Sequence, residues 1–218
     1  MRSRIVEEYK KKLSLSDRQK EILIGAILGD GHLEKLYTLE LSRLKIEHSY
    51  KQKEYVDWFY EEFKNWIRTK PKQKIKKVFG KIHKNYGFCT YGHRLLGIFQ
   101  KDFYTEKKKV IPDDLLENIT PLSLAVWYMD DGSIKSNKHK GVFLNTQSFT
   151  EKDVKFLQSI LENKFGITSS TRKDETGEQI YLGGKFGEKF VKIIEPFIIP
   201  SMKYKIPRVL RLTELPKE

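Results

Sequence analysis

Two segments of the chain share one pattern, an apolar run that ends in Asp-Gly. Residues 23–31 read LIGAILGDG and residues 124–132 read LAVWYMDDG. Their carboxylates, Asp30 and Asp131, lie 101 residues apart. A carboxylate at the end of an apolar helix is costly to desolvate, so two equivalent copies indicate a common purpose that brings them together. Binding of divalent cations through carboxylate oxygens is the chemistry that fits this pair best.

The repeat extends over most of the chain. After each aspartate comes a β-type stretch, then a long amphipathic helix, a polar hairpin and a short helix. Each half ends with a lysine shortly before Ile-Pro, Lys109 in the first half and Lys205 in the second, and His48 matches Gln147 in the same alignment. We expect strands at 37–41 and 142–146, hairpins at 74–90 and 168–182, and hairpin turns at 84–87 and 173–177.

This order of elements predicts the fold class. Each half has antiparallel hairpins rather than parallel crossovers, which indicates a mixed α/β (α+β) fold of two tandem αββαββα half-domains. The half-domains are expected at residues 14–115 and 116–212. Gly25 and Gly29 stand four residues apart on one helix face, where another backbone could approach closely. We therefore expect the halves to pack through the two motif helices, bringing the two acids near each other.

Both motif helices carry recognisable start signals. Ser16 with Gln19 has the spacing of a capping box, and Thr120 precedes a proline in the first turn of the second helix. At the other ends, Gly31 and Gly132 suit the left-handed residue with which many helices end. The sequence thus predicts two short apolar helices with defined ends.

The charge of the chain points to an anionic partner. The formal net charge is +13, from 42 Lys and Arg against 29 Asp and Glu. Residues 64–84 hold nine Lys or Arg and no acid, and apolar residues such as Trp66 and Ile75 alternate with them. Such a density repels itself unless it is solvated or matched by phosphates, and the apolar residues indicate a folded hairpin. Nucleic acid is therefore the expected partner.

Cysteine content and hydropathy limit the remaining classes. The single Cys89 excludes an internal disulfide framework and an all-cysteine zinc site, which fits a reducing compartment. No apolar stretch approaches the roughly 18 residues that span a bilayer, and the N-terminal residues are charged rather than an apolar signal core. We expect a soluble protein with no membrane partner that is intracellular, cytoplasmic or organellar, and not secreted.

The two motifs and the elements that follow them resemble the LAGLIDADG homing endonucleases, in the single-chain form that carries two motifs. The resemblance covers residues 16–210. More specific signatures, at 120–132, 144–149 and 204–207, look like those of the branch of yeast mitochondrial type. One apolar nine-residue motif would be weak evidence, whereas two copies with matching downstream elements are specific.

The resemblance implies an activity and a cofactor. It implies a site-specific endonuclease that hydrolyses one phosphodiester per strand of double-stranded DNA across the minor groove and leaves 3′ overhangs. Similar but unequal halves in one chain imply a monomer with a long asymmetric target and a saddle of antiparallel sheets for DNA. Two or three divalent cations, Mg²⁺ by preference, would bind at a centre formed by Asp30 and Asp131.

The resemblance also assigns roles to residues around the two catalytic acids. The proposed roles are carbonyl ligands of the metal at Gly29 and Asp130, lysines beside the metals at Lys109 and Lys205, and solvent-ordering side chains at His48 and Gln147.

DNA contacts are expected from the hairpins and the strands beside them. A two-stranded antiparallel ribbon fits the major groove, where alternate side chains face the base edges. The candidate contacts are Arg43, Lys45, Lys74, Lys76, Lys81 and Lys84 in the first half, and Lys135, Asn137, Lys138, Arg172 and Lys173 in the second.

Three other functions fit parts of the sequence. A group I intron RNA maturase, or a non-catalytic DNA-binding protein on the same scaffold, would need neither acid, yet both are present. Residues 128–131 read YMDD, similar to the catalytic box of reverse transcriptases. That box sits on a β-hairpin within a much longer polymerase, whereas this one ends a capped apolar helical run. The endonuclease is therefore the first hypothesis, with the maturase as its alternative and intron RNA as a further partner.

Overall fold

The computed structural model describes residues 2–36, 40–78, 80–106, 108–175 and 177–211. The chain divides into two compact units, Met1–Glu106 (unit 1) and Lys107–Glu218 (unit 2). The half-domain limits of 14–115 and 116–212 stay predictions, as does the packing of the halves through the motif helices.

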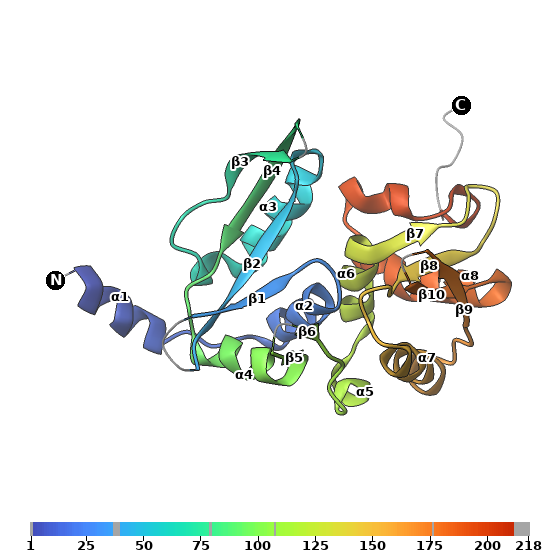
Figure 1. The fold of residues 1–218 in the computed structure, drawn as a ribbon, viewed down its shortest axis with the longest axis horizontal. Coiled ribbons are helices and arrows are strands. Elements are labelled where there is room, and N and C mark those ends of the chain that lie inside the picture. Colours follow the sequence, from blue (N-terminus) through green and yellow to red (C-terminus); the bar gives the residue numbers. More distant parts are fainter. Residues whose placement is uncertain (1, 37–39, 79, 107, 176, 212–218) are drawn as a thin grey trace. The chain divides into compact units, whose positions relative to one another are not determined.

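Unit 1 is built on a four-stranded antiparallel sheet of order β1-β2-β4-β3 (Figure 1). Helices α3 and α4 pack against the sheet. The elements of unit 1 are α1 (Arg2–Lys11), α2 (Asp17–Leu28), β1 (His32–Lys35), β2 (Ser42–Ser49), α3 (Lys53–Phe63), β3 (Lys72–Val78), β4 (Lys81–Cys89), α4 (Arg94–Phe103) and β5 (Tyr104–Thr105), with 3-10 turns η1 (Tyr50–Gln52) and η2 (Lys64–Trp66).

Unit 2 repeats this topology, with an antiparallel sheet of order β7-β8-β10-β9. Its elements are β6 (Lys108–Lys109), α5 (Leu115–Asn118), α6 (Pro121–Asp131), β7 (Gly132–Ile134), β8 (Val142–Asn145), α7 (Glu151–Phe165), β9 (Ser170–Asp174), β10 (Gly177–Leu182), α8 (Gly184–Ile194), η3 (Glu195–Phe197), η4 (Pro200–Lys205) and η5 (Arg208–Leu210). Helices α6, α7 and α8 pack against this sheet. The predicted mixed α/β fold with antiparallel sheets is confirmed.

Alternation along β2 gives the sheet of unit 1 one covered and one open face. Ser42, Leu44, Ile46 and His48 are buried, and the residues between them are half-buried. Successive side chains of a strand point to opposite faces, so the buried set faces the helices. The other face of the sheet is left to polar residues.

The motif helices are the most deeply buried segments. Residues 22–29 of α2 and its C-cap, and residues 122–129 of α6, are all buried. A helix that is apolar on every side belongs in a protein core. Among the described residues, no helix is both long and apolar enough to cross a membrane.

The structure corrects the first half's strand and hairpin predictions. Of the strand expected at 37–41, residues 37–39 lie outside the described residues, and the long strand of this region is β2. The hairpin between β3 and β4 turns at Gly80, with φ +77°, and not at 84–87. Gly87 lies instead within β4, opposite Glu47, where a Cβ would come within 2.3 Å of the Ile46 carbonyl oxygen. Close approach of two backbones therefore explains this glycine.

The second hairpin agrees with its prediction. Strands β9 and β10 pair in register from Gly177 and Asp174 onward, so the turn lies within 173–177. Gly177 has φ +146°, a conformation that L side chains rarely adopt. The turn chemistry read from the sequence was correct here because the glycine stands at the turn itself.

The predicted helix starts are confirmed. The Ser16 and Gln19 side chains and backbones form a reciprocal capping box, and the Thr120 hydroxyl accepts from the Ser123 N–H. The predicted left-handed ends are wrong, because Gly132 has φ −76° and Gly31 is not among the glycines with positive φ.

Crowding explains the two glycines after the motif acids. A Cβ on Gly31 would lie 2.7 Å from the Ala26 carbonyl oxygen, and one on Gly132 would lie 2.4 Å from that of Tyr128. Each glycine thus lets the chain turn back tightly over the last turn of its helix as it enters the next strand.

Ser16→Ala is expected to lower the free energy of unfolding by about 1 kcal/mol, since it removes the acceptor for the Gln19 N–H at the start of α2. Urea denaturation followed by circular dichroism measures the change. Ser14→Ala, at an exposed position before the cap, is the matched control and should change little. Equal losses in both variants would contradict the capping role.

Candidate functional site

In unit 1, the first motif acid lies next to a buried histidine. Asp30 follows α2, and its side chain is 56% exposed. The Nδ1 atom of His48 lies 3.7 Å from Oδ2 of Asp30, and the His48 side chain is only 4% exposed. The imidazole packs against Tyr55, with ring centroids 5.1 Å apart, and stacks on Phe59. His48 therefore reaches the carboxylate from inside the core, held in one orientation by the aromatic side chains of α3.

In unit 2, a lysine contacts the peptide that precedes the second motif acid. The Nζ atom of Lys205 donates to the backbone carbonyl oxygen of Asp130 at 2.6 Å. Asp131, which ends α6, is half-buried. The Tyr128 hydroxyl in turn donates to the carbonyl oxygen of Lys205 at 2.6 Å. Burial raises the pKa of Tyr128, so this phenol stays protonated and keeps its donor proton.

These two hydrogen bonds tie the segment around Lys205 to the end of α6. The tyrosine holds the lysine's backbone, and the lysine side chain returns to the helix terminus. A cation near the last carbonyl oxygens of a helix interacts favourably with the helix dipole. The positive charge of Lys205 is thereby positioned one residue from the Asp131 backbone.

Lys109 and Gln147 are the other two residues predicted to assist the motif acids, and both are half-buried. Lys109 ends the short strand β6 and is half-buried. Gln147 follows β8, is half-buried, and lies against the turn of the second hairpin, since a Cβ on Gly177 would come within 3.0 Å of the Gln147 Cα atom. The roles predicted for both residues stay predictions.

Strand register corrects the pairing of His48 with Gln147 in the repeat. His32 and Ser133 each come two residues after a motif aspartate, and they pair with Lys45 and Phe143. Three residues beyond these partners lie His48 and Thr146. Thr146 is buried like His48, and its hydroxyl donates to the Glu178 carbonyl oxygen at 2.7 Å. The counterpart of Gln147 is therefore Ser49, one position further along the strand.

The open face of the unit 1 sheet is strongly basic. Cross-strand register places side chains of β2, β3 and β4 together on the side away from α3 and α4. We call this set the basic face: Arg43, Lys45, Glu47, Lys72, Lys74, Lys76, Lys81, His83 and Asn85. Five of the six DNA contacts predicted for the first half belong to it. This face is the surface of unit 1 best suited to a polyanion.

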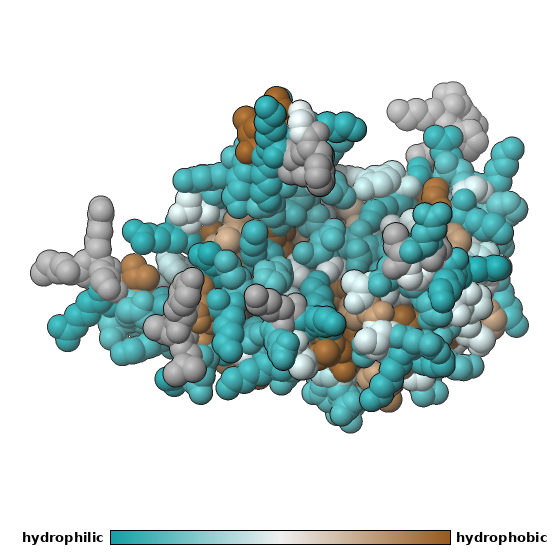
Figure 2. Space-filling model, viewed as in Figure 1, coloured by the Kyte–Doolittle hydropathy of each residue, from teal (hydrophilic) through white to brown (hydrophobic). Residues whose placement is uncertain are grey.

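Lys84 does not belong to the basic face. It pairs with Ile75 and alternates with Asn85, so its side chain lies on the opposite side of the hairpin. Ile75 and Ile82 on that side are 66% and 68% exposed, and Figure 2 shows hydrophobic atoms near the tip of β3 and β4. The hairpin thus extends beyond its covering helices, and we leave Lys84 out of the proposed base contacts.

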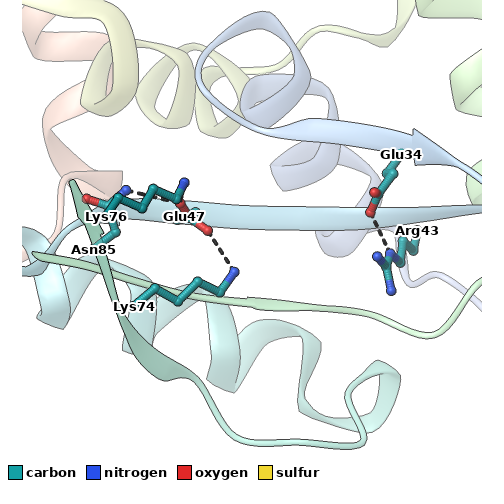
Figure 3. Close-up of polar contacts among 6 residues, drawn as sticks. All are labelled: Glu34, Arg43, Glu47, Lys74, Lys76 and Asn85. Atoms are coloured by element: carbon teal, nitrogen blue, oxygen red, sulfur yellow. Dashed lines mark hydrogen bonds and ion pairs between the residues drawn. The ribbon is translucent and has the colours of Figure 1, made fainter. Parts of the chain in front are cut away.

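A carboxylate organises the basic face, and sequence reasoning missed it. Glu47 accepts hydrogen bonds from Lys74 at 2.7 Å, from Lys76, and from the Asn85 amide at 3.0 Å (Figure 3). Burial alone would raise the pKa of Glu47, but these hydrogen bonds and the lysine charges lower it to about 2. The alternating burial of β2 is the signal that would have placed this acid among the lysines.

A second ion pair lies toward the start of β2. The Nε atom of Arg43 donates to Glu34 of β1 at 2.7 Å (Figure 3). The hydrogen bond from Arg43 lowers the pKa of Glu34, so this carboxylate stays ionised. Two acids thus hold three of the cations predicted to contact DNA in defined positions before DNA binds.

Glu47→Gln is expected to destabilise the protein by up to about 2 kcal/mol at pH 7, a bound reduced by solvent screening of the half-exposed lysines. The folded-state pKa is depressed, so the contribution is present above pH 4.5 and is lost as pH falls towards about 2. Urea midpoints of both proteins at pH 7 and near pH 2.5 measure the gap. A gap that stays constant over this range would contradict the ion-pair origin.

The open face of the unit 2 sheet is less basic and more aromatic. Phe143 and Tyr181 pack with ring centroids 4.8 Å apart. Arg172 and Lys135 lie over the Tyr181 ring, at 5.3 and 5.7 Å from its centroid. Cation-π contact with the same ring brings these two predicted DNA contacts together.

The other predicted contacts of unit 2 lie elsewhere. Asn137 and Lys138 are exposed in the loop between β7 and β8. Lys173 pairs with Glu178 and alternates with Arg172, so its side chain lies on the side of the sheet opposite the open face, as that of Lys84 does in unit 1. Gln179, which donates to the Asn145 side chain at 3.0 Å, lies on the open face and was missed by sequence reasoning.

Two known proteins are similar in sequence to this chain over most of its length. A probable intron-encoded endonuclease 1 of Wickerhamomyces canadensis is 34% identical over 211 residues, 94% of this chain and 90% of that protein. The cytochrome b mRNA maturase bI2 of Debaryomyces hansenii is 32% identical over 198 residues, 88% of this chain and 74% of that protein.

A solved structure is similar to this chain in both fold and sequence. The homing endonuclease I-WcaI, described as bound to its DNA recognition sequence, superposes with a TM-score of 0.86 at 32% identity, covering 95% of this chain and 92% of that one. Residues 20–190 match the LAGLIDADG DNA endonuclease family, which confirms the resemblance predicted from the two motifs. The chain belongs to the LAGLIDADG DNA endonuclease family.

Proposed function

We propose that this protein is a homing endonuclease that cuts both strands of one long, asymmetric DNA site as a monomer. The observation that carries the proposal is that two units of one topology each end a buried motif helix at a carboxylate, Asp30 and Asp131. The solved structure of I-WcaI with its DNA recognition sequence supports DNA as the partner. Two unequal copies of the site suit an asymmetric duplex with one scissile phosphate per strand.

The proposed DNA-binding surfaces are the basic face of unit 1 and, in unit 2, the open face of the sheet together with the loop between β7 and β8. Lysines and arginines on an open antiparallel sheet match the phosphates and base edges of a major groove. The proposed contacts are Arg43, Lys45, Lys74, Lys76 and Lys81 in unit 1, and Lys135, Asn137, Lys138 and Arg172 in unit 2. The sum of these charges predicts binding that weakens steeply with salt.

The residues at the motif ends fit divalent cations such as Mg²⁺. Asp30 presents an exposed carboxylate, Asp131 is half-buried, and both peptides before them end in carbonyl oxygens at a helix terminus. An all-oxygen donor set of this kind suits Mg²⁺, which keeps several of its own waters. Asp30, Asp131 and the carbonyls of Gly29 and Asp130 would hold two or three ions. When bound, the ions would neutralise charge on the scissile phosphates and activate water.

Four side chains near the motif acids would assist hydrolysis. Lys205, held at the Asp130 carbonyl, would offset negative charge that develops near Asp131. His48, which approaches Asp30 from the buried side, would keep the carboxylate oriented. We propose the parallel assisting role for Lys109 in the first centre and a solvent-ordering role for Gln147.

The proposal also includes the outcome of cleavage. Hydrolysis across the minor groove, as in the family, would give staggered ends with 3′ overhangs. Incubating the purified protein with a randomised duplex library and Mg²⁺, then sequencing the ends, tests site specificity and stagger together. Ca²⁺, which fits oxygen sites less rigidly, serves as the metal control. Absence of any enriched cut site in Mg²⁺ would contradict the proposal.

A second candidate function rests on one specific observation, the 32% identity to a cytochrome b mRNA maturase. The same basic surfaces would then bind structured intron RNA. Splicing of a host intron by the Asp30→Asn variant tests this function, since RNA folding assistance does not use the motif acids. Splicing that requires both acids would contradict a maturase role separate from cleavage.

A further inference from the structure

A groove lies at the end of the basic face where β2 and β3 begin and β4 ends. Its volume is about 460 Å³. The sheet supplies its floor, helix α1 one wall, and the segment from Arg68 to Lys70 another. Because Arg43, Lys72 and Lys74 line it, the groove is continuous with the basic face.

The lining of the groove is chemically a site for phosphate. Among its described lining residues the side chains that carry positive charge are Lys10, Arg43, Arg68, Lys70, Lys72 and Lys74. Three of them already face a carboxylate: Lys10 pairs with Glu7 of the lining at 2.9 Å, Arg43 with Glu34 at 2.7 Å and Lys74 with Glu47 at 2.7 Å. Arg68, Lys70 and Lys72 remain as the excess positive charge of the described lining. The excess charge favours a polyanion over an apolar or cationic ligand.

The wall formed by α1 is held in place by contacts with unit 1. The Tyr9 hydroxyl donates to the Asn65 carbonyl oxygen at 2.7 Å, and its ring packs edge-on against Tyr91. The ring nitrogen Nε2 of His93 lies 3.1 Å from the Lys10 carbonyl oxygen. Helix α1 precedes residues 20–190, the part of the chain that matches the family. The groove is thus completed by a segment that lies outside the family match.

We propose that this groove binds the phosphate backbone of DNA flanking the core target, so that α1 and the 68–70 segment lengthen the site on the unit 1 side. The inference rests on the proposed function, because it assumes that duplex DNA lies on the basic face. The groove and the basic face share Arg43 and Lys74, so one duplex can contact both surfaces. Arg43 and Lys74 contact the core target, and Arg68 and Lys70 bind phosphates of the flanking DNA. Contacts of this kind add affinity without reading sequence.

The first test compares two duplexes in Ca²⁺, one limited to the core target and one with about 10 further base pairs on the unit 1 side. We expect Arg68→Gln/Lys70→Gln to weaken binding of the long duplex about 10-fold and to lower its salt slope by about 2, with core binding unchanged. Lys10→Gln should act in the same direction. Lys11→Gln, the next residue of α1 and outside the groove lining, is the matched control.

Cys89 provides a readout that does not depend on cleavage or on a known target. It is the one cysteine of the chain, and it lines the groove. N-ethylmaleimide should label Cys89 of the full-length protein more slowly when a long duplex is bound than when a core-length duplex is bound. Protection with no cleavage in Mg²⁺ would reject the proposed nuclease while keeping the groove as a DNA site.

Three results would overturn the groove proposal. One is equal loss of affinity for both duplexes in the Arg68→Gln/Lys70→Gln variant, and another is labelling of Cys89 at the same rate with either duplex. The third is protection of Cys89 by structured RNA alone, which would assign the groove to the maturase alternative.

Discussion

Asp30→Asn and Asp131→Asn are each expected to lower the rate of double-strand cleavage by about 10³-fold or more, while DNA affinity changes by less than about threefold. Asparagine keeps the shape of the side chain but removes the negative charge that would hold a divalent cation. The loss falls on the chemical step because the proposed DNA contacts are other side chains, on the sheets and the β7–β8 loop, and do not include the two motif acids. A supercoiled plasmid with one target separates the effects, since nicked and linear products are resolved on one gel.

The matched control is Asp113→Asn, which removes an exposed carboxylate between the two motif helices in the sequence. It should cleave at the wild-type rate. If each acid serves its own strand, the motif variants will accumulate nicked plasmid before any linear product forms. Full linearisation by either motif variant at the wild-type rate would reject the assignment of these two residues.

Lys205→Met is expected to lower the single-turnover cleavage rate by about 10²-fold at saturating protein, with DNA affinity nearly unchanged. Methionine retains much of the apolar stem but cannot donate to the Asp130 carbonyl oxygen, which accepts from Lys205 at 2.6 Å. The positive charge next to the second motif acid would also be lost. The rate is measured over a range of Mg²⁺ concentrations to separate weaker ion binding from slower chemistry.

Lys203→Met is the control, because Lys203 is exposed on the same short helix. Lys205→Arg should restore part of the activity, since it keeps the charge with a different donor geometry. Urea denaturation of both variants checks whether the hydrogen bond matters only for folding. A normal cleavage rate in Lys205→Met, or an equal loss in Lys203→Met, would contradict the role.

Local signals predicted much of the fold. The capping box at Ser16 and the cap at Thr120 depend on residues within one turn, and the structure contains both. The order of helices and strands followed from hydrophobic periodicity, which each segment carries by itself. The turn at Gly177 was correct for the same reason, since a glycine with positive φ stands where the chain reverses.

The errors came from features that two distant segments decide together. Gly87 looked like a turn residue but lies in a strand, because its lack of a Cβ admits the Ile46 backbone. His48 was matched to Gln147, whereas strand register makes Thr146 its counterpart. A shift of one residue along a strand reverses the face of every side chain, so register must be known before faces can be assigned.

By itself the sequence determined the family, the αββαββα order of the halves and the two acids that end the motif helices. It also determined the basic charge that predicts a nucleic-acid partner. The tertiary structure alone decided that His48 lies next to Asp30 and that Lys205 contacts the Asp130 carbonyl. It also decided that Glu47 accepts hydrogen bonds from two lysines of the basic face. Periodicity and capping act over a few residues, whereas these contacts depend on how strands and turns far apart in the chain pack together.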